Sequence, residues 1–361
     1  MKKTAVLEFP RRKTVQVRVG DVLIGGGAPI SVQSMTKTDT RDVRATLAQI
    51  RRLEKEGCQI VRLAVPDVAA AEALGKIKAR AGLPLIADIH FDHRLALACL
   101  RKGIDGLRIN PGNIGGRKKV EEVVRAARER AVPIRIGVNS GSLEKGLLAR
   151  FGGATAEAMS ESALRHIRIL EDLDFRLIKV SLKASDVPRT VEAYRRLAAK
   201  VDYPFHAGIT EAGGLLRGSV KSAAGIALLL REGLADNIRV SLTAPPEQEV
   251  RVAFQILGSL GLSRRGTVVI SCPACGRSES NLAGIAARIE KALASSATPL
   301  TVAVMGCMVN GPGEAREADL GVACGRGNGV LFKAGKFLAR VAEKDIVPAL
   351  IREIERMKVR P

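Results

Sequence analysis

Three cysteines and one glutamate near the carboxyl end of the chain have the types and spacing of a metal or redox site. Cys272 and Cys275 form a C-P-A-C turn, Cys307 follows in M-G-C-M-V-N-G-P-G-E, and Glu314 ends that segment. A C-x-x-C pair can present two thiolates to one metal centre, and a third cysteine from a separate turn can complete three sides of a site. The spacing by itself leaves zinc, a redox-active dithiol and an iron–sulfur cluster open.

The other cysteines and the first residues indicate the compartment. The chain has six cysteines in 361 residues, begins M-K-K-T without an apolar signal core, and contains no apolar run long enough to span a membrane. We therefore expect a cytoplasmic protein without a membrane partner, whose cysteines serve a metal or catalysis rather than a disulfide framework. Cys58 and Cys99 stand singly in apolar patterns, which is typical of inert buried thiols.

A strand–turn–helix pattern recurs through the first 262 residues and would position a site upstream of the cysteines. Amphipathic helices are predicted between the strands, for example over 42–56 and 117–131. Eight such repeats fit a (β/α)8 TIM barrel in number and size. An open doubly wound sheet fits less well, because the glycine run 25–27 precedes the first strand instead of following it. Residues 1–24 predict a small hairpin that caps the barrel floor. The candidate strands are 29–35, 59–65, 84–90, 106–110, 133–139, 176–184, 204–212 and 237–243.

Polar side chains concentrate at the carboxyl ends of these strands, where barrel active sites lie. Within most strands they share parity, and side chains of the same parity lie on the same face of a strand. We expect them to point into the barrel mouth, although a buried polar layer or stabilising salt bridges would explain any single one. The residues are Arg62, Asp88, His90, Arg108, Asn110, Arg135, Asn139, Lys179, Ser181, Lys183, Glu211, Arg239 and Ser241.

Four cations at these ends would hold a strongly anionic ligand, because a guanidinium binds phosphate through two parallel hydrogen bonds. They are Arg62, Arg108, Arg135 and Lys183. His90 could donate to a phosphate or transfer a proton. Glu211, a carboxylate among many cations, is a candidate acid or base.

The last hundred residues predict a smaller α+β domain. Strands over 267–271 and 301–305 each end at a cysteine turn, so the two turns can meet at one edge of a sheet. Zinc would favour a second short-spaced pair of ligands, which is missing, and a dithiol would not require Cys307. The residues therefore favour a [4Fe-4S] cluster over zinc or a dithiol.

The net charge of +21 is compatible with several kinds of partner. Lys and Arg could neutralise nucleic-acid phosphates, but aromatic residues are only 3% of the chain and Trp is absent, which leaves few side chains for stacking on single-stranded bases. An anionic small substrate or an acidic carrier protein explains the charge equally well. The alternative from another class is a basic nucleic-acid-binding protein with a structural zinc site.

Nine motifs spread over most of the chain, taken together and in order, resemble the 4-hydroxy-3-methylbut-2-enyl diphosphate synthase family in its short bacterial two-domain form. That family contains reductive iron–sulfur enzymes of the methylerythritol phosphate pathway of isoprenoid (terpenoid) biosynthesis. The motifs are V-Q-S-M-T, A-D-I-H-F, R-I-N-P-G-N-I-G, V-N-S-G-S-L, S-L-K-A-S-D-V, G-I-T-E-A-G-G, R-V-S-L-T, C-P-A-C-G-R and G-C-M-V-N-G-P-G-E-A.

The resemblance implies an activity and a set of site residues. The enzyme would be an oxidoreductase that opens the ring of 2-C-methyl-D-erythritol 2,4-cyclodiphosphate with two electrons and removes water. Glu211 would be the proton donor. A [4Fe-4S] cluster would be held by Cys272, Cys275, Cys307 and Glu314, without Cys324. The diphosphate would be bound by Arg62, His90, Arg108, Arg135, Asn139, Lys183 and Ser241.

The resemblance also implies domains and partners. Residues 1–262 would form the substrate-binding barrel and residues 263–361 the cluster domain. Ferredoxin or flavodoxin would donate the electrons. The protein would be a homodimer whose active site is shared between subunits, and neither a nucleic acid nor a membrane would be a partner.

Overall fold

The computed structural model of the chain describes residues 9–263, 265–278, 280–294, 296, 298–307, 311, 313 and 316–358. The chain divides into two compact units, Met1–Leu260 and Gly261–Pro361.

The first unit is a barrel of eight parallel strands, each at the place where the sequence predicts one. The order around the sheet is β8-β7-β6-β5-β4-β3-β10-β9. A bridge between Val180 of β8 and Phe205, just before β9, brings the two ends of this sheet together. β9 and β10 are much shorter than predicted. The strands are β3 (Ser31–Met35), β4 (Ile60–Ala64), β5 (Leu85–Asp88), β6 (Gly106–Ile109), β7 (Ile134–Asn139), β8 (Ile178–Lys183), β9 (His206–Ala207) and β10 (Asn237–Ile238).

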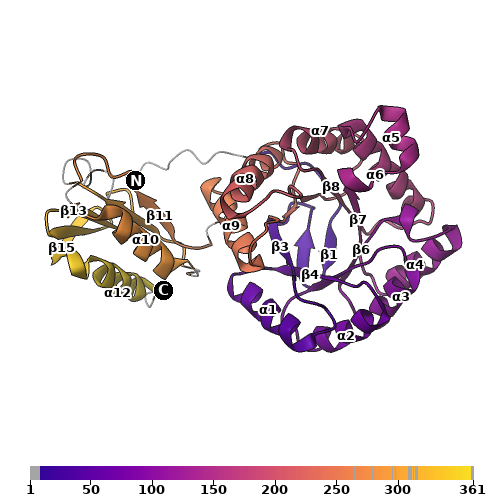
Figure 1. Ribbon diagram of the computed structural model, residues 1–361, viewed down its shortest axis with the longest axis horizontal. Coiled ribbons are helices and arrows are strands. Elements are labelled where there is room, and N and C mark those ends of the chain that lie inside the picture. Colours follow the sequence, from indigo (N-terminus) through magenta and orange to yellow (C-terminus); the bar gives the residue numbers. More distant parts are fainter. Residues whose placement is uncertain are drawn as a thin grey trace. The chain divides into compact units, whose positions relative to one another are not determined.

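Helices form a ring around these strands (Figure 1). Several begin at an aspartate whose carboxylate accepts a backbone N–H of the first turn, as Asp42 does before α1 and Asp186 before α7. Gly57, Gly103 and Gly233, all with positive φ, follow α1, α3 and α8 and end these helices. The helices are α1 (Val43–Lys55), α2 (Val68–Lys78), α3 (His93–Arg101), α4 (Arg117–Glu129), α5 (Lys145–Phe151), α6 (Ala156–Glu171), α7 (Val187–Ala198), α8 (Leu215–Arg231) and α9 (Pro246–Ser259).

A hairpin closes the amino-terminal end of the barrel. β1 (Val17–Val19) pairs antiparallel with β2 (Val22–Ile24), and their buried side chains pack against Ile60 and Ile86 near the starts of β4 and β5. The predicted cap on the barrel floor is therefore confirmed for its described residues. The opposite end of the barrel is left for the site.

The second unit is a five-stranded mixed sheet. Its strands follow the order β11-β12-β13-β14-β15, with the first three parallel and the last two antiparallel. Apolar side chains of α10 and α12 pack on one face of this sheet. β15 has no counterpart among the strands predicted from the sequence. The elements are β11 (Val268–Ser271), α10 (Leu282–Leu293), β12 (Thr301–Met305), β13 (Leu320–Gly325), β14 (Asn328–Lys333), β15 (Lys336–Ala342) and α12 (Ile346–Lys358).

No helix in the described part of the chain is both long and apolar enough to cross a membrane.

Candidate active site

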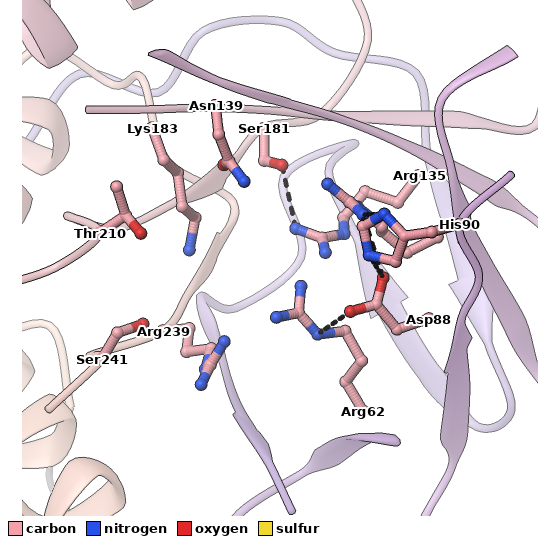
Figure 2. Close-up of a pocket in the computed structure, with 11 residues that line it drawn as sticks. Arg62, Asp88, His90, Arg135, Asn139, Ser181, Lys183, Thr210, Arg239 and Ser241 are labelled. Atoms are coloured by element: carbon pink, nitrogen blue, oxygen red, sulfur yellow. Dashed lines mark hydrogen bonds and ion pairs between the residues drawn. The ribbon is translucent and has the colours of Figure 1, made fainter. Parts of the chain in front are cut away.

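A polar cavity lies at the carboxyl ends of the barrel strands (Figure 2). It contains about 460 Å³ of space, part of it open to solvent. All seven residues predicted to bind a diphosphate line it, and most of its cationic side chains point toward its centre. The lining residues are Arg62, Asp88, His90, Arg108, Arg135, Asn139, Ser181, Lys183, Thr210, Arg239 and Ser241.

Asp88 is the one carboxylate in this lining, and it holds two arginines in place. Its Oδ1 accepts a hydrogen bond from Arg108 Nη1 at 3.2 Å, and its Oδ2 lies 3.6 Å from Arg62 Nε. Burial alone would raise the pKa of Asp88, but the charge of Arg62, a hydrogen bond from His90 and the charge of Arg108 outweigh burial and lower the pKa below its ordinary range. Asp88 is therefore ionised and orients the cations.

His90 completes this cluster at the more exposed side of the cavity. Its Nε2 lies 2.7 Å from Arg108 Nη1 and 3.5 Å from Asp88 Oδ1. Arg108 is further fixed by a hydrogen bond from its Nη2 to the carbonyl oxygen of Gly137, at 3.0 Å. A Cβ at position 137 would lie 2.5 Å from Arg108 Nε, so glycine is required for this approach.

Arg135 is a buried cation with unused hydrogen-bonding capacity. Its side chain is buried, with the residue only 3% exposed, and Nη1 donates to Ser181 Oγ at 2.9 Å. Its Nε and Nη2 have no hydrogen-bond partner among the described residues. Burial, followed by the charges of Arg62 and Arg108, lowers the pKa of Arg135 well below its ordinary value. A buried guanidinium with idle donors among other cations is a site for an anion.

Arg239 and Lys183 line the other side of the cavity. Arg239 Nη2 lies 3.7 Å from Oε2 of Glu249, a buried residue of α9. Glu249 also accepts hydrogen bonds from Ser34 Oγ at 3.3 Å and from the Leu242 amide at 3.0 Å. Burial and the charge of Arg62 lower the pKa of Arg239 to about 10. Cations thus outnumber carboxylates at this end of the barrel.

Glu211, the predicted proton donor, lies next to this cavity and outside its lining. Thr210 lines the cavity, and Glu211 follows it, exposed and with φ of +52°. A non-glycine residue with this φ is strained by about 1–3 kcal/mol, and such strain concentrates at functional sites. The carboxylate is close to the cavity in sequence, but the structure does not place it among the lining side chains.

Several residues at this end of the barrel have positions or contacts that the sequence does not predict. Thr210 was not singled out, although its position beside Glu211 was a signal, and Glu249 was missed because it reaches the strands from a helix. Lys179 was expected at the mouth but lies deeper in the barrel and is 1% exposed. Asn110 was also expected at the mouth, but its Oδ1 accepts the Gly137 amide at 3.2 Å, and it does not line the cavity.

The three predicted thiol ligands lie on neighbouring turns of the second unit. Cys272 directly follows β11 and Cys307 comes soon after β12, and these strands pair in parallel, so both turns leave the same edge of the sheet. The Gly306 amide donates to Cys272 Sγ at 3.3 Å. A backbone hydrogen bond from Arg277 lowers the pKa of the exposed Cys275 thiol. The charge of Cys307 acts in the opposite direction and is a smaller effect.

These features fit the cysteine side of a metal cluster, because N–H donors stabilise thiolates. Among the described residues, no three His, Cys, Asp or Glu side chains converge on a position for a single metal ion. Glu314, the predicted fourth ligand, lies outside the described residues. Cys324 is buried in the core under α10 and α12.

The fold and the cavity together define a TIM-barrel protein with a cation-rich site for an anionic ligand. The model of the GcpE TIM-barrel domain matches residues 14–254, and that of the GcpE protein C-terminal domain matches residues 268–356. The chain belongs to the GcpE family.

Relatives from several bacteria match nearly the whole chain, and those described here are named 4-hydroxy-3-methylbut-2-en-1-yl diphosphate synthase (flavodoxin). The protein of Geobacter sulfurreducens is 62% identical over 347 residues, which cover 96% of this chain and 98% of the relative. That of Thermodesulfovibrio yellowstonii is 57% identical over 346 residues, 96% of this chain and 99% of the relative. That of Dehalococcoides mccartyi is 56% identical over 344 residues, 95% and 98% respectively. The family resemblance found in the sequence is confirmed, and the nucleic-acid-binding alternative receives no support.

Proposed function

We propose that this chain is an oxidoreductase that converts 2-C-methyl-D-erythritol 2,4-cyclodiphosphate to 4-hydroxy-3-methylbut-2-enyl diphosphate, with reduced flavodoxin as electron donor. The observation that carries the proposal is the buried Arg135 guanidinium with two idle nitrogens in a cavity where cations outnumber carboxylates. The names of the relatives support this reaction and flavodoxin as the donor. Ferredoxin, the other predicted donor, has no such support.

The barrel residues would bind the cyclic diphosphate and hold it still. The cations of the cavity neutralise the phosphates, with Arg135 offering Nε and Nη2 as a fork. His90 stands at the exposed side of the cavity and can donate to a phosphate oxygen. Asn139 and Ser241 supply neutral polar groups. Because Asp88 and Glu249 fix the arginines before the ligand arrives, little side-chain order has to be gained on binding.

The reaction breaks the bond between the ring carbon and a phosphate oxygen, adds two electrons, and expels a hydroxyl group as water. The departing phosphate oxygen keeps the bonding pair as an anion, which the cavity arginines stabilise. Glu211 supplies the proton with which the hydroxyl leaves. The strained backbone at Glu211, in the loop between β9 and α8, supports this role, because such strain concentrates at functional sites.

A [4Fe-4S] cluster held by Cys272, Cys275, Cys307 and Glu314 supplies the electrons when it is bound. Support comes from the thiol turns at one sheet edge and from the Gly306 amide directed at Cys272. The division into a substrate-binding domain, residues 1–262, and a cluster domain, residues 263–361, is supported by the two compact units. A cytoplasmic location stays a prediction from the sequence.

The homodimer is also proposed, and one surface of the barrel supports it. Apolar side chains spaced four residues apart run along the outside of α8 and are exposed: Leu216, Val220, Ala224 and Leu228. A continuous exposed apolar stripe on a helix is typical of an association surface. We therefore take α8 as the face that a second copy of the chain covers.

The test is an anaerobic assay of the purified protein with the cyclic diphosphate and reduced flavodoxin, with reduced ferredoxin in a parallel reaction. We expect formation of the linear hydroxybutenyl diphosphate and oxidation of two equivalents of carrier per product. A protein with a full complement of iron that binds the cyclic diphosphate and does not reduce it would overturn the proposed reaction.

A further inference from the structure

A chain of buried polar side chains lies beside the cavity, and nothing in the proposed reaction uses it. It consists of Lys179, His206, Asn237 and Ser31, which come from β8, β9, β10 and β3. These strands are consecutive around the barrel. His206 and Asn237 are completely buried. Burying polar side chains costs free energy unless each of them is hydrogen-bonded. The partners and the purpose of these four side chains therefore have to be accounted for.

The orientation of the Asn237 amide is fixed by a backbone carbonyl. Asn237 Nδ2 donates to the carbonyl oxygen of Ser31 at 3.0 Å and to Ser31 Oγ at 2.9 Å. A carbonyl oxygen can only accept, so the nitrogen of the amide must face Ser31. Asn237 Oδ1 therefore faces His206 Nδ1, with which it forms a short hydrogen bond, and it also lies 3.5 Å from Lys179 Nζ.

This orientation decides which ring nitrogen of His206 carries the proton. Because Asn237 Oδ1 can only accept, Nδ1 of His206 is the donor and bears the hydrogen. The groups facing the ring are cationic: Lys183 and Lys179 from β8 and Arg135 from β7. Burial and these charges lower the pKa of His206 well below its ordinary value, so the ring is neutral. Its Nε2 then carries no hydrogen, and the lone pair on this nitrogen can accept a hydrogen bond.

That lone pair faces a residue of the cavity. Lys183 Nζ lies 3.3 Å from His206 Nε2, within reach to donate to it. Gly208 leaves the space for this lysine, since a Cβ at position 208 would lie 2.9 Å from Lys183 Nζ and 2.2 Å from the Arg239 carbonyl oxygen. One hydrogen of the ammonium group is thus bound internally, and the others can point at a ligand.

We propose that His206 is a positioning residue, locked as the Nδ1–H tautomer by Asn237 and Ser31, which accepts a hydrogen bond from Lys183 and holds its ammonium group toward the bound anion. The inference rests on the proposed binding of a cyclic diphosphate in this cavity. Burial, followed by the charges of Arg239 and Arg135, lowers the pKa of Lys183 well below its ordinary value. Without the acceptor at Nε2, this lysine would have no hydrogen-bond partner among the described residues to orient it.

The tautomer is tested by nitrogen NMR of protein labelled with [15N]histidine, which needs no substrate. The chain has four histidines, so the signal lost in His206→Gln assigns this one. We expect it to show a protonated Nδ1 and a bare Nε2, without titration between about pH 5 and pH 8, where an ordinary histidine changes charge. A ring protonated at Nε2, or an imidazolium in this range, would overturn the inference whatever the enzyme's reaction.

The positioning role is tested by steady-state kinetics of two substitutions. His206→Leu removes the acceptor, and we expect KM for the cyclic diphosphate to rise about tenfold with kcat changed less than about twofold. His206→Gln keeps an oxygen that can accept from Lys183, and we expect most of the affinity back. An unchanged KM in the leucine variant, or equal losses in both variants, would show that His206 does not position Lys183.

Asn237→Asp provides a check if the leucine variant fails to fold. A carboxylate in place of the amide oxygen should let His206 take a second proton, which destroys the acceptor at Nε2. We expect an imidazolium signal together with the raised KM. An imidazolium with an unchanged KM would contradict the role assigned to Nε2. If the unsubstituted protein shows the expected tautomer and does not convert the cyclic diphosphate, that result would instead count against the proposed reaction.

Discussion

Arg108 donates a hydrogen bond to Asp88, with 3.2 Å between Nη1 and Oδ1. The negative charge of Asp88 offsets part of the positive charge of the arginines that line the cavity. Asp88→Asn keeps the shape of the side chain and removes the charge. The buried Arg108 and the partly buried Arg62 would then be left without a compensating charge. Breaking a buried ion pair costs about 3–5 kcal/mol. We therefore expect calorimetry at pH 7 to show an unfolding temperature of the barrel that is about 5–10 °C lower than in the parent protein.

The pH dependence of this difference follows from the direction of the Asp88 shift. Its pKa is lowered in the folded protein, so the stabilisation is complete above the ordinary carboxyl pKa of about 4 and is lost as the pH falls below it. The two proteins should therefore differ equally at pH 7 and pH 5 and converge in stronger acid. Asp172→Asn, at an exposed helix end, is the control and should change little. Equal melting of Asp88→Asn and parent at pH 7 would contradict the assignment.

The idle nitrogens of Arg135 predict a loss of substrate affinity in Arg135→Lys. Lysine keeps the charge but cannot present Nε and Nη2 as a fork. We expect binding of the cyclic diphosphate, measured by titration calorimetry, to weaken about 10- to 100-fold, which corresponds to one or two charge-assisted hydrogen bonds. Arg130→Lys, on the surface end of α4, should bind like the parent protein. Parent-like affinity in Arg135→Lys would remove Arg135 from the diphosphate site.

The strained φ of Glu211 allows its chemical role to be separated from its structural cost. Glu211→Gly should abolish turnover while raising the melting temperature by about 2–4 °C, because glycine adopts φ of +52° without strain. Asp174→Gly, at φ of +54°, should gain similar stability and keep full turnover. Glu211→Gln should bind the cyclic diphosphate and fail to convert it. Normal turnover in Glu211→Gln would exclude the carboxylate as proton donor.

The cluster ligands are tested by iron and sulfide content after anaerobic purification. Cys272→Ala, Cys275→Ala and Cys307→Ala should each lose most of the iron and the visible absorption. Glu314→Ala should retain a more labile cluster and lose turnover. Cys324→Ala is the matched control, because this thiol lies in the hydrophobic core, and it should retain the parent's iron content. Full iron in any of the three cysteine variants would show that the thiol is not a ligand.

The apolar stripe of α8 predicts the surface of the homodimer. Val220→Lys should raise the dimer dissociation constant at least about tenfold in analytical ultracentrifugation, because a lysine ammonium must be desolvated there. Val68→Lys is a matched control, since Val68 on α2 is 63% exposed and Val220 is 64% exposed. If both variants dissociate equally, or neither does, α8 is not the contact face.

The sequence predicted the barrel and much of its cavity for a physical reason that can be followed in single strands. Asp88 and His90 have the same parity, and so do Lys179 and Lys183; period-two alternation fixes which face a side chain occupies. It does not fix the depth along the barrel axis. Lys183 therefore reaches the cavity, whereas Lys179 of the same strand and face is buried below it.

Sequence patterns are local, and they do not predict contacts between segments that are distant in the chain. Glu249 lies on a helix, and its carboxylate meets Ser34 and Arg239 only because the chain closes into a barrel. β15 was missed because its residues, Lys336–Ala342, are mostly exposed and mix helix and strand formers. The short ladders of β9 and β10 were also not predictable, since the strand-like patterns of apolar residues continue past the last paired residue, to Ile209 after β9 and to Leu242 after β10.

The short ladders of β9 and β10 affect how readily the barrel opens locally. With two residues each in β9 and β10, and a bridge at Val180 and Phe205, this sector has fewer interstrand backbone hydrogen bonds than the neighbouring β7–β8 pair. Amide deuterium uptake should therefore be fastest in the sector that carries Thr210, Glu211 and Ser241, and slowest in β7 and β8. We therefore expect the side of the cavity that carries Ser241 to move more readily than the side formed by Arg135 and Lys183.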